Sequence, residues 1–214
     1  MIKMIGFDMD GTVGDTLPLC IKVFGEAVSP YAGHTLSEAE ITRTFGLNEE
    51  GMIGAVIPGR REEALADYHK LYKEMHSTCP EPFDGIRELI RSLQEKGILV
   101  VMITGKGAES CRITLEQFGM SGFFCEVETG RADYPCKTEA ILRLLKKYNL
   151  HKDEFYYVGD EVTDIKACQA AGVRCLSAAW KTGAAKERLA AENSWYVFDR
   201  VEALRQYLCY PELL

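Results

Sequence analysis

The chain has 214 residues, of which 47% are hydrophobic and 27% charged, and this is enough apolar sequence for one buried core with a small insertion. Its formal net charge of −7 argues against binding to nucleic acid or to an anionic membrane, because those surfaces require clustered lysine and arginine. We therefore expect a small-molecule partner, with no nucleic acid and no membrane.

Five short apolar runs are typical of strands that are buried on both faces. They are MIKMIGF at 1–7, GILVVMIT at 97–104, FFCEVE at 123–128, FYYVGD at 155–160 and VRCLSAA at 173–179. Helical patterns lie between most of these runs, as in right-handed βαβ units. The sequence therefore predicts an α/β fold in which a Rossmann-like parallel sheet has helices on both faces.

Residues 14–82 interrupt this alternation, because they contain four helical patterns and no strand pattern. One of the patterns opens with the capping box Ser37-x-x-Glu40. The prolines and the glycine of STCPEPFDG, at 77–85, indicate the hinge where the chain returns to the sheet. We expect a small α-helical cap at 14–82, inserted after the first strand, and a core formed by 1–13 and 83–214.

The helical patterns after the hinge carry signals for their ends. Gly97, Gly119 and Gly172 each stand at the end of one pattern, where a glycine commonly stops a helix. Asp84 is expected to cap the N-terminus of the first of these helices.

The eight cysteines form no C-x-x-C pair, so the sequence spells neither a zinc ribbon nor a thioredoxin-like motif. We expect reduced and mostly buried thiols. The chain opens without a charged leader, and no apolar run reaches about 18 residues, so we expect a cytoplasmic protein. Whether the protein is a monomer or a homodimer stays open.

The polar residues at the predicted strand ends are the candidates for a site, because ligands of open parallel sheets bind beyond the carboxyl ends of the strands. Asp8 and Asp10 follow the first strand, Thr104 ends the second, and Asp160 ends FYYVGD. Asp164 lies four positions after Asp160, and we expect the two to share a helix face.

This set of carboxylates requires a cation. Two carboxylates about 4 Å apart repel by about 4 kcal/mol at an effective dielectric constant near 20, and Asp160 would add to the repulsion between Asp8 and Asp10. Oxygen ligands with neither histidine nor thiol indicate a hard metal. Mg²⁺ is the expected cofactor, because it binds through one or two carboxylates and keeps waters for a phosphate.

The remaining polar groups at the strand ends are hydrogen-bond donors. They are the hydroxyl of Thr104, the backbone N–H groups around Gly11, Thr12 and Gly105, and the ammonium of Lys137. An anion with several oxygens, such as a phosphoryl group, fits this set. Lys106 competes with Lys137 for the role of the ammonium, because both segments can reach the same edge.

The two aspartates of the first strand end can divide the chemistry of phosphate hydrolysis. A carboxylate can attack phosphorus and form an aspartyl phosphate, so Asp8 is the expected nucleophile. Asp10, two residues farther in an extended segment, points the same way. It is then placed to protonate the leaving oxygen and later to activate the water that hydrolyses the intermediate.

The motifs DMDGT, ITGK, Lys137 and GDEVTD, in this order, resemble the four motifs of the haloacid dehalogenase superfamily of phosphatases and phosphomutases. The place of the helical insertion resembles the subgroup with a helical cap, which includes phosphoglycolate phosphatase, pyrophosphatases and β-phosphoglucomutase. The resemblance implies that Asp8 is the nucleophile and a metal ligand. It implies that Asp10 is the acid/base group, with its backbone carbonyl on the metal.

The resemblance also assigns the later motifs. Thr104 and Lys137 stabilise the phosphate and the intermediate. Asp160 is a direct metal ligand, and Asp164 is a second or water-mediated one. The expected enzyme is a Mg²⁺-dependent phosphatase that acts on a small-molecule phosphate ester, which can be phosphoglycolate, a sugar phosphate, a nucleotide or pyrophosphate.

Other functions of similar proteins are less favoured. Dehalogenases that resemble this family lack the second aspartate, so Asp10 argues against dehalogenation. β-Phosphoglucomutase has a histidine on its first cap helix, whereas TLPLCIKVF has none. A two-component receiver domain is shorter and carries its phospho-accepting aspartate on a middle strand. A pyrophosphatase and an idle binding protein of the same fold stay possible.

The cap is expected to contact the leaving group, exclude water and set specificity. The alternative for each candidate contact is a solvated cap surface, and the histidines of the fourth cap pattern, His69 and His76, are expected to be exposed. The candidate contacts are Thr16, Arg43, Asn48, Glu49, Arg60, Arg61, Tyr72 and His76.

Overall fold

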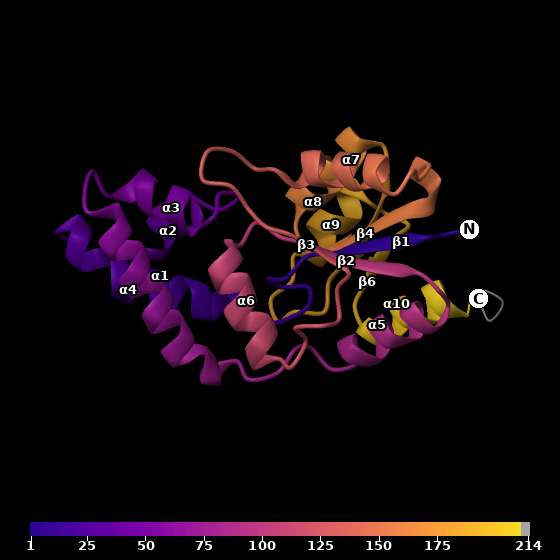
Figure 1. The fold of residues 1–214 in the computed structure, drawn as a ribbon, viewed down its shortest axis with the longest axis horizontal. Helices are drawn as coiled ribbons and strands as arrows, with labels where there is room; N and C mark the ends of the chain where they lie inside the picture. Colours follow the sequence, from indigo (N-terminus) through magenta and orange to yellow (C-terminus); the bar gives the residue numbers. More distant parts are fainter. Residues whose placement is uncertain (211–214) are drawn as a thin grey trace.

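The computed structural model describes residues 1–210 and has a six-stranded sheet at its centre (Figure 1). The strands are β1 (Met4–Phe7), β2 (Leu99–Ile103), β3 (Glu126–Glu128), β4 (Phe155–Gly159), β5 (Arg174–Ala178) and β6 (Val197–Phe198). They pair in the order β3-β2-β1-β4-β5-β6, and every pairing is parallel. The predicted sheet is confirmed, and β6 is an addition that is too short to give a strand pattern.

Helices cover both faces of the sheet, as predicted. They are α5 (Ile86–Glu95), α6 (Ala108–Gln117), α7 (Lys137–Lys147), α8 (Val162–Ala171), α9 (Lys186–Glu192) and α10 (Val201–Cys209). Helices α5 and α10 pack on one face and α7, α8 and α9 on the other (Figure 1). Ile5 and Phe7 of β1 are buried on the first face and Met4 on the second, because successive side chains of a strand alternate.

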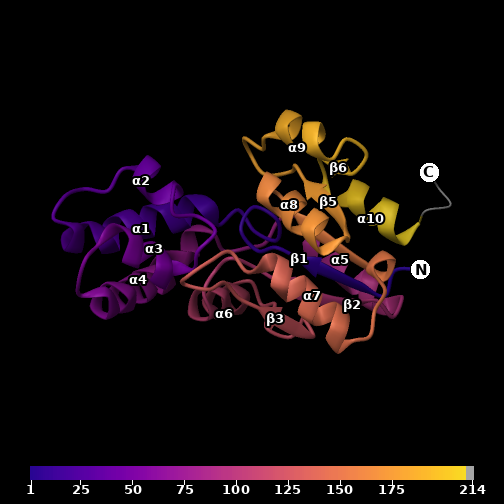
Figure 2. The same cartoon turned by 90° about the horizontal axis from the view of Figure 1, so that it is seen from above.

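Four helices lie between β1 and the hinge, and we call them the cap helices. They are α1 (Leu17–Ala32), α2 (Glu38–Thr42), α3 (Glu49–Val56) and α4 (Arg61–Met75), and a short 3₁₀ turn (His76–Thr78) follows them. They lie at one end of the molecule, and the first residue and α10 lie at the other (Figures 1 and 2). The cap boundaries at 14 and 82 stay a prediction.

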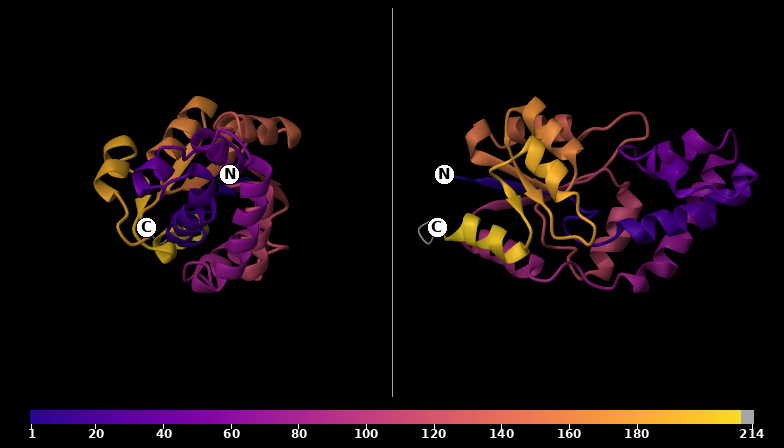
Figure 3. Two further views of the ribbon diagram at one scale, coloured as in Figure 1. Left: turned by 90° about the vertical axis from the view of Figure 1, so that its left-hand side faces the viewer. Right: turned by 180° about the vertical axis from the view of Figure 1, so that it is seen from behind.

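The cap helices have a hydrophobic cluster of their own, which includes Val23, Phe24, Ile53 and Tyr68. Ile113 of α6 belongs to the same cluster, whereas Cys111 and Leu115 of α6 are buried with the sheet. Helix α6 therefore packs against both parts, and Figure 3 shows it between the cap helices and the sheet.

The helix ends agree with the sequence signals except at α5. The capping box of Ser37 and Glu40 forms at α2, and Gly172 is the left-handed C-cap of α8 with φ 76°. The prediction of Asp84 as the N-cap of α5 is wrong, because Gly85 takes that position with φ 82°. The left-handed glycine turns the chain into the helix and leaves Asp84 exposed.

None of the eight cysteines is paired with another, and five of them are buried, which confirms the expectation of mostly buried thiols. Among residues 1–210, no helix is both long enough and apolar enough to cross a membrane.

Candidate active site

The register of the sheet brings three predicted strand ends to one edge. Phe7 of β1 pairs with Met102 of β2 and with Val158 of β4, so the next residues of these strands leave the sheet side by side. The Asp8 backbone N–H continues the ladder by donating to the Val158 carbonyl at 2.9 Å. The strands run toward the cap helices, so this edge faces the cap (Figure 1).

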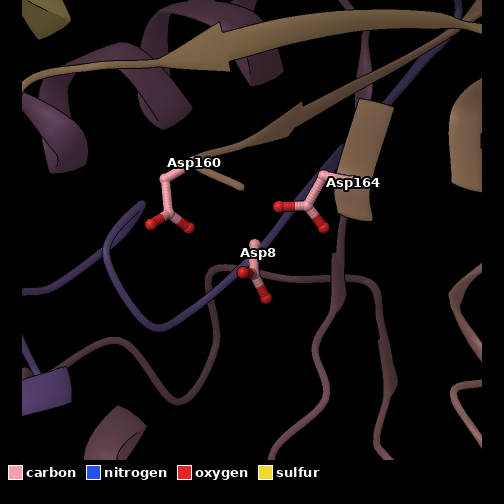
Figure 4. Close-up of side chains that lie close together, drawn as sticks. All are labelled: Asp8, Asp160 and Asp164. Carbon is pink, nitrogen blue, oxygen red and sulfur yellow. The ribbon is translucent and has the colours of Figure 1, made fainter. Parts of the chain in front are cut away.

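Asp8, Asp160 and Asp164 form a buried acidic cluster at this edge, and we call it the core cluster. One carboxylate oxygen from each residue lies within 4.8 Å of the other two (Figure 4). Asp164 belongs to the first turn of α8, and its Oδ2 accepts a hydrogen bond from the Glu161 backbone N–H at 3.1 Å. A set of three oxygen ligands without histidine or thiol fits a hard divalent cation.

The expectation that Asp160 and Asp164 share a helix face is wrong, because Asp160 is not part of the helix. Helix α8 begins at Val162, so Asp160 lies between the end of β4 and the helix. The two side chains converge because the chain turns between them, and Gly159 permits this turn. A Cβ at Gly159 would lie 2.5 Å from the carboxyl carbon of Asp164.

The DGT motif makes a tight turn around the core cluster. Gly11 has φ +81°, and a Cβ there would overlap the Asp160 carboxylate. The hydroxyl of Thr12 donates to Asp160 Oδ1 at 3.3 Å. The backbone N–H groups of Gly11 and Thr12 donate to the carbonyls of Gly14 and Met9 within the turn. The motif therefore places its glycine and its hydroxyl directly against the cluster.

Two lysines neutralise part of the charge of the core cluster. Lys137 is the first residue of α7, and its Nζ lies 3.0 Å from Asp8 Oδ2 and 2.6 Å from Asp164 Oδ1. Lys181, in the segment after β5, forms an ion pair with Asp160. The motif order predicts the position of Lys137, whereas Lys181 is a finding of the structure.

The protonation behaviour of the core cluster follows from its burial. The pKa of Asp8 is raised to about 8, because burial and the neighbouring carboxylates raise it more than Lys137 lowers it. Burial likewise raises the pKa of Asp160 to about 6, although Lys181 opposes the shift. The two lysines thus do not neutralise the three carboxylates of the cluster. A divalent cation bound there would stabilise the ionised carboxylates.

Asp10 lies outside the core cluster and directs its carboxylate toward the cap helices, so the expectation that it points the same way as Asp8 is wrong. The reason is that β1 ends at Phe7 and the chain turns at Asp10, so the segment is not extended there. Asp10 Oδ1 accepts a hydrogen bond from Thr16 Oγ1 at 2.5 Å, and Lys106 Nζ lies 3.2 Å from the same atom. Thr104 is buried, and its Oγ1 accepts a hydrogen bond from the Lys106 backbone N–H at 3.2 Å. Lys106 is thus on the Asp10 side of the site, and Lys137 is on the Asp8 side.

The candidate cap contacts divide into two groups. Three of them are buried beside Asp10 or Lys106, namely Thr16, Glu49 and Tyr72. The alternative that these residues form a solvated cap surface is therefore wrong. Asn48 is partly buried and donates from Nδ2 to the Gly130 carbonyl at 3.3 Å. Three arginines are exposed instead, as the solvated alternative predicts; they are Arg43, Arg60 and Arg61.

His76 is fully buried, so the prediction of an exposed histidine is wrong for this residue. Its Nε2 lies 3.0 Å from Thr114 Oγ1, and its ring packs against the rings of Tyr72 and Phe118. Burial lowers its pKa. The end of α4 packs on α6, and a sequence pattern for α4 alone does not contain that contact.

A parallel α/β sheet with a buried acidic cluster at its carboxyl edge places the protein among the α/β enzymes. The sequence pattern of the haloacid dehalogenase-like hydrolases matches residues 5–178, so the chain belongs to this family. The comparisons confirm the resemblance carried by the motifs and the expectation of a phosphatase-type enzyme.

The similar proteins include phosphatases of two kinds. A phosphoglycolate phosphatase from Photobacterium profundum is 27% identical over 184 residues, which cover 79% of this chain and 80% of the relative. Pyrophosphatase PpaX from Halalkalibacterium halodurans is 27% identical over 179 residues, which cover 81% of each chain. A haloacid dehalogenase-like hydrolase from Streptococcus pneumoniae has a TM-score of 0.75 at 20% identity, over 97% of this chain and 98% of that one.

Proposed function

We propose that the protein is a Mg²⁺-dependent phosphatase that hydrolyses a small phosphorylated metabolite through an aspartyl-phosphate intermediate. The observation that carries the proposal is that two neighbouring carboxylates, those of Asp8 and Asp10, have different partners. Asp8 belongs to the core cluster, with Lys137 Nζ 3.0 Å from its Oδ2. Asp10 faces the cap side, where Thr16 donates to it. The first carboxylate therefore faces the phosphate, and the second faces the group that leaves.

The core cluster would hold the metal. Asp8 and Asp160 would bind it directly, Asp164 directly or through water, and Asp10 through its backbone carbonyl. When bound, Mg²⁺ neutralises the carboxylates and the phosphoryl oxygens. The all-oxygen donor set and the incomplete neutralisation by Lys137 support this assignment.

The reaction would proceed in two displacements. A carboxylate oxygen of Asp8 attacks phosphorus, the bond to the leaving oxygen breaks, and Asp10 gives its proton to that oxygen. Asp10 then accepts a proton from a water molecule, the water oxygen bonds to phosphorus, and the bond between phosphorus and Asp8 breaks. Thr104, Gly105 and Lys137 would bind the phosphoryl oxygens. The N–H groups of Gly11 and Thr12, which the sequence also suggests for this role, already donate within their own turn, so we do not retain them.

The helical segment 14–82 would act as a cap domain over the core formed by 1–13 and 83–214. Three contacts of the cap helices with this side of the site support the assignment: Thr16 donates to Asp10, Asn48 donates to the Gly130 carbonyl, and the Tyr72 ring lies against Lys106 Nζ. Arg43 is exposed, and we do not retain it as a substrate contact. The named relatives make phosphoglycolate and pyrophosphate the first substrates to test.

Hydrolysis of p-nitrophenyl phosphate tests the proposal. We expect activity that requires Mg²⁺, is removed by EDTA, and falls more than about 10⁴-fold in Asp8→Asn, because an amide cannot replace the nucleophile. Asp153→Asn is the matched control, since that side chain is 90% exposed, and it should keep full activity. Activity that persists in Asp8→Asn contradicts the assignment of the nucleophile.

A further inference from the structure

A second group of charged side chains lies where the cap helices meet the core, and Lys106 is at its centre. The Lys106 side chain is only 2% exposed, and its Nζ lies 3.2 Å from Asp10 Oδ1. Cys20 Sγ of α1 lies 3.1 Å from the same nitrogen, and the Tyr72 ring of α4 lies under it at 4.7 Å. The core thus places a buried cation directly against side chains of the cap helices.

Glu49 of α3 is the second carboxylate near Lys106. Its Oε1 lies 3.9 Å from Lys106 Nζ, and its Oε2 accepts a hydrogen bond from the Gly107 backbone N–H at 2.7 Å. Glu49 is the first residue of α3, and Gly107 is the N-cap of α6. The carboxylate therefore lies at the N-termini of two helices, and their dipoles offset its negative charge.

This arrangement leaves the positive charge of Lys106 available on the Asp10 side. Asp10 is the group that gives its proton to the leaving oxygen, so that oxygen has to lie within hydrogen-bond distance of Asp10. The atoms attached to the leaving oxygen would then lie next to Asp10, where Lys106 Nζ is also found. Because Lys106 Nζ lies 3.2 Å from Asp10 Oδ1, an anionic group on the leaving part of the substrate would meet the positive charge of Lys106 on this side.

We infer, on the basis of the proposed function, that Lys106 determines specificity by binding a second anionic group on the leaving part of the substrate. The substrate class is a small phosphate ester or anhydride that carries a carboxylate or a phosphoryl group within a few bonds of the leaving oxygen. Glu49 acts as a positioning residue, because it holds Lys106 from the cap side and is itself fixed by Gly107.

The test compares substrates that differ only in this second charge. Phosphoglycolate and its neutral amide share the phosphoryl group and the carbon skeleton, and pyrophosphate provides a phosphoryl in place of the carboxylate. For the wild-type protein with Mg²⁺, we expect kcat/KM for phosphoglycolate to exceed that for the amide by about tenfold to a hundredfold, as for a charge-assisted hydrogen bond. Turnover of pyrophosphate shows whether a phosphoryl group serves as well.

Variants at two lysines locate the effect. In Lys106→Met the ratio of the two kcat/KM values should fall to within about threefold of one, since the charge that distinguishes the substrates is gone. Lys106→Arg should keep most of the ratio. Lys73→Met is the matched control, because Lys73 is an exposed lysine next to Tyr72 on α4, and it should leave the ratio unchanged.

The outcomes separate this inference from the proposed function. A wild-type ratio below about threefold overturns the inference, and so does a folded Lys106→Met variant with the wild-type ratio. The wild-type and Lys106→Arg measurements decide the matter if thermal unfolding shows that Lys106→Met does not fold. If the wild-type protein with Mg²⁺ hydrolyses none of the substrates, p-nitrophenyl phosphate included, the proposed function is overturned instead.

Discussion

The core cluster and the group around Lys106 arrange buried charges in two different ways. In the core cluster, three buried carboxylates share two lysines, and burial raises the pKa of Asp8 to about 8. Around Lys106, one buried ammonium lies between the carboxylates of Asp10 and Glu49. Both groups have one more carboxylate than ammonium, but the carboxylates of the core cluster converge on one another, whereas those of the second group lie on two sides of the ammonium.

This difference shows how the two groups depend on the rest of the fold. The core cluster comes from the ends of β1 and β4 and from the first turn of α8, so the register of the sheet fixes it. The second group forms only when α3 and α4 lie against the loop after β2. The sheet fixes the core cluster, and the contact of the cap helices with the core fixes the surroundings of Lys106, so the two can be altered separately.

The largest expected effect is that of a substitution at Asp10, which separates protonation of the leaving oxygen from activation of the water. Asp10→Asn should lower kcat for alkyl phosphates by about 10²- to 10⁴-fold, because the leaving oxygen no longer receives a proton. With p-nitrophenyl phosphate, whose leaving group needs no proton, the first step should survive and the phosphorylated enzyme should accumulate. Mass spectrometry of the acid-quenched protein measures this. Equal losses for both substrates, without a phosphoprotein, would contradict the assignment of Asp10.

Removal of the metal tests the charge deficit of the core cluster. The pKa values of Asp8 and Asp160 are raised from 3.8 to about 8 and about 6, so the folded metal-free protein holds protons that the unfolded chain releases. The free energy of unfolding should therefore fall as the pH rises from about 4 to about 8. Mg²⁺ should oppose this loss, and most strongly near pH 8.

The measurement is thermal unfolding at several pH values, with and without Mg²⁺. A free Mg²⁺ concentration of 100 times Kd should add about 2.7 kcal/mol, or about 5–10 °C in Tm for a chain of this size. NaCl at the same ionic strength is the control and should have little effect. A Tm that Mg²⁺ leaves unchanged at pH 8 would refute the metal site.

A smaller effect should follow from a change at the contact of α3 with the core. A Cβ at Gly51 would overlap the Ala132 carbonyl, so Gly51→Ala should push α3 away from this loop and disturb Glu49. We expect kcat/KM to fall about tenfold, as for a small misplacement of groups near the site. Steady-state kinetics with p-nitrophenyl phosphate measures the change.

Gly25→Ala is the control, because a Cβ there has only an ordinary contact, 3.6 Å from Ile41. In α1 this change should raise the free energy of unfolding by about 1 kcal/mol or less and leave the kinetics unchanged, since alanine favours the helix. Full activity in Gly51→Ala would show that the α3 contact does not position the site.

The sheet and the core cluster could be predicted because their signals are local. Apolar runs mark β1 to β5, and the aspartates that end β1 and β4 meet because parallel strands share one edge. The turn between Asp160 and α8 could not be predicted, since the sequence of this segment also fits a helix that begins at Asp160. The two residues of β6 carry no pattern of their own.

The group around Lys106 could not be predicted in the same way, because its contacts join distant segments. Glu49 and Gly107 are 58 positions apart, and Lys106 and Cys20 are 86 apart. Nothing in ITGK distinguishes a buried lysine from a solvated one. His76 shows the same limit, since its burial depends on α6 and not on the pattern of α4.

Helix α6 has a consequence for how the protein folds and for how it can be divided. Ile113 completes the hydrophobic cluster of the cap helices, while Cys111 and Leu115, on the same helix, are buried with the sheet. A fragment that contains only the cap segment would lack this side chain and expose the apolar face that covers it. The two parts should therefore unfold in one cooperative transition, and transplanting the cap to another core would require the matching surface of α6 as well.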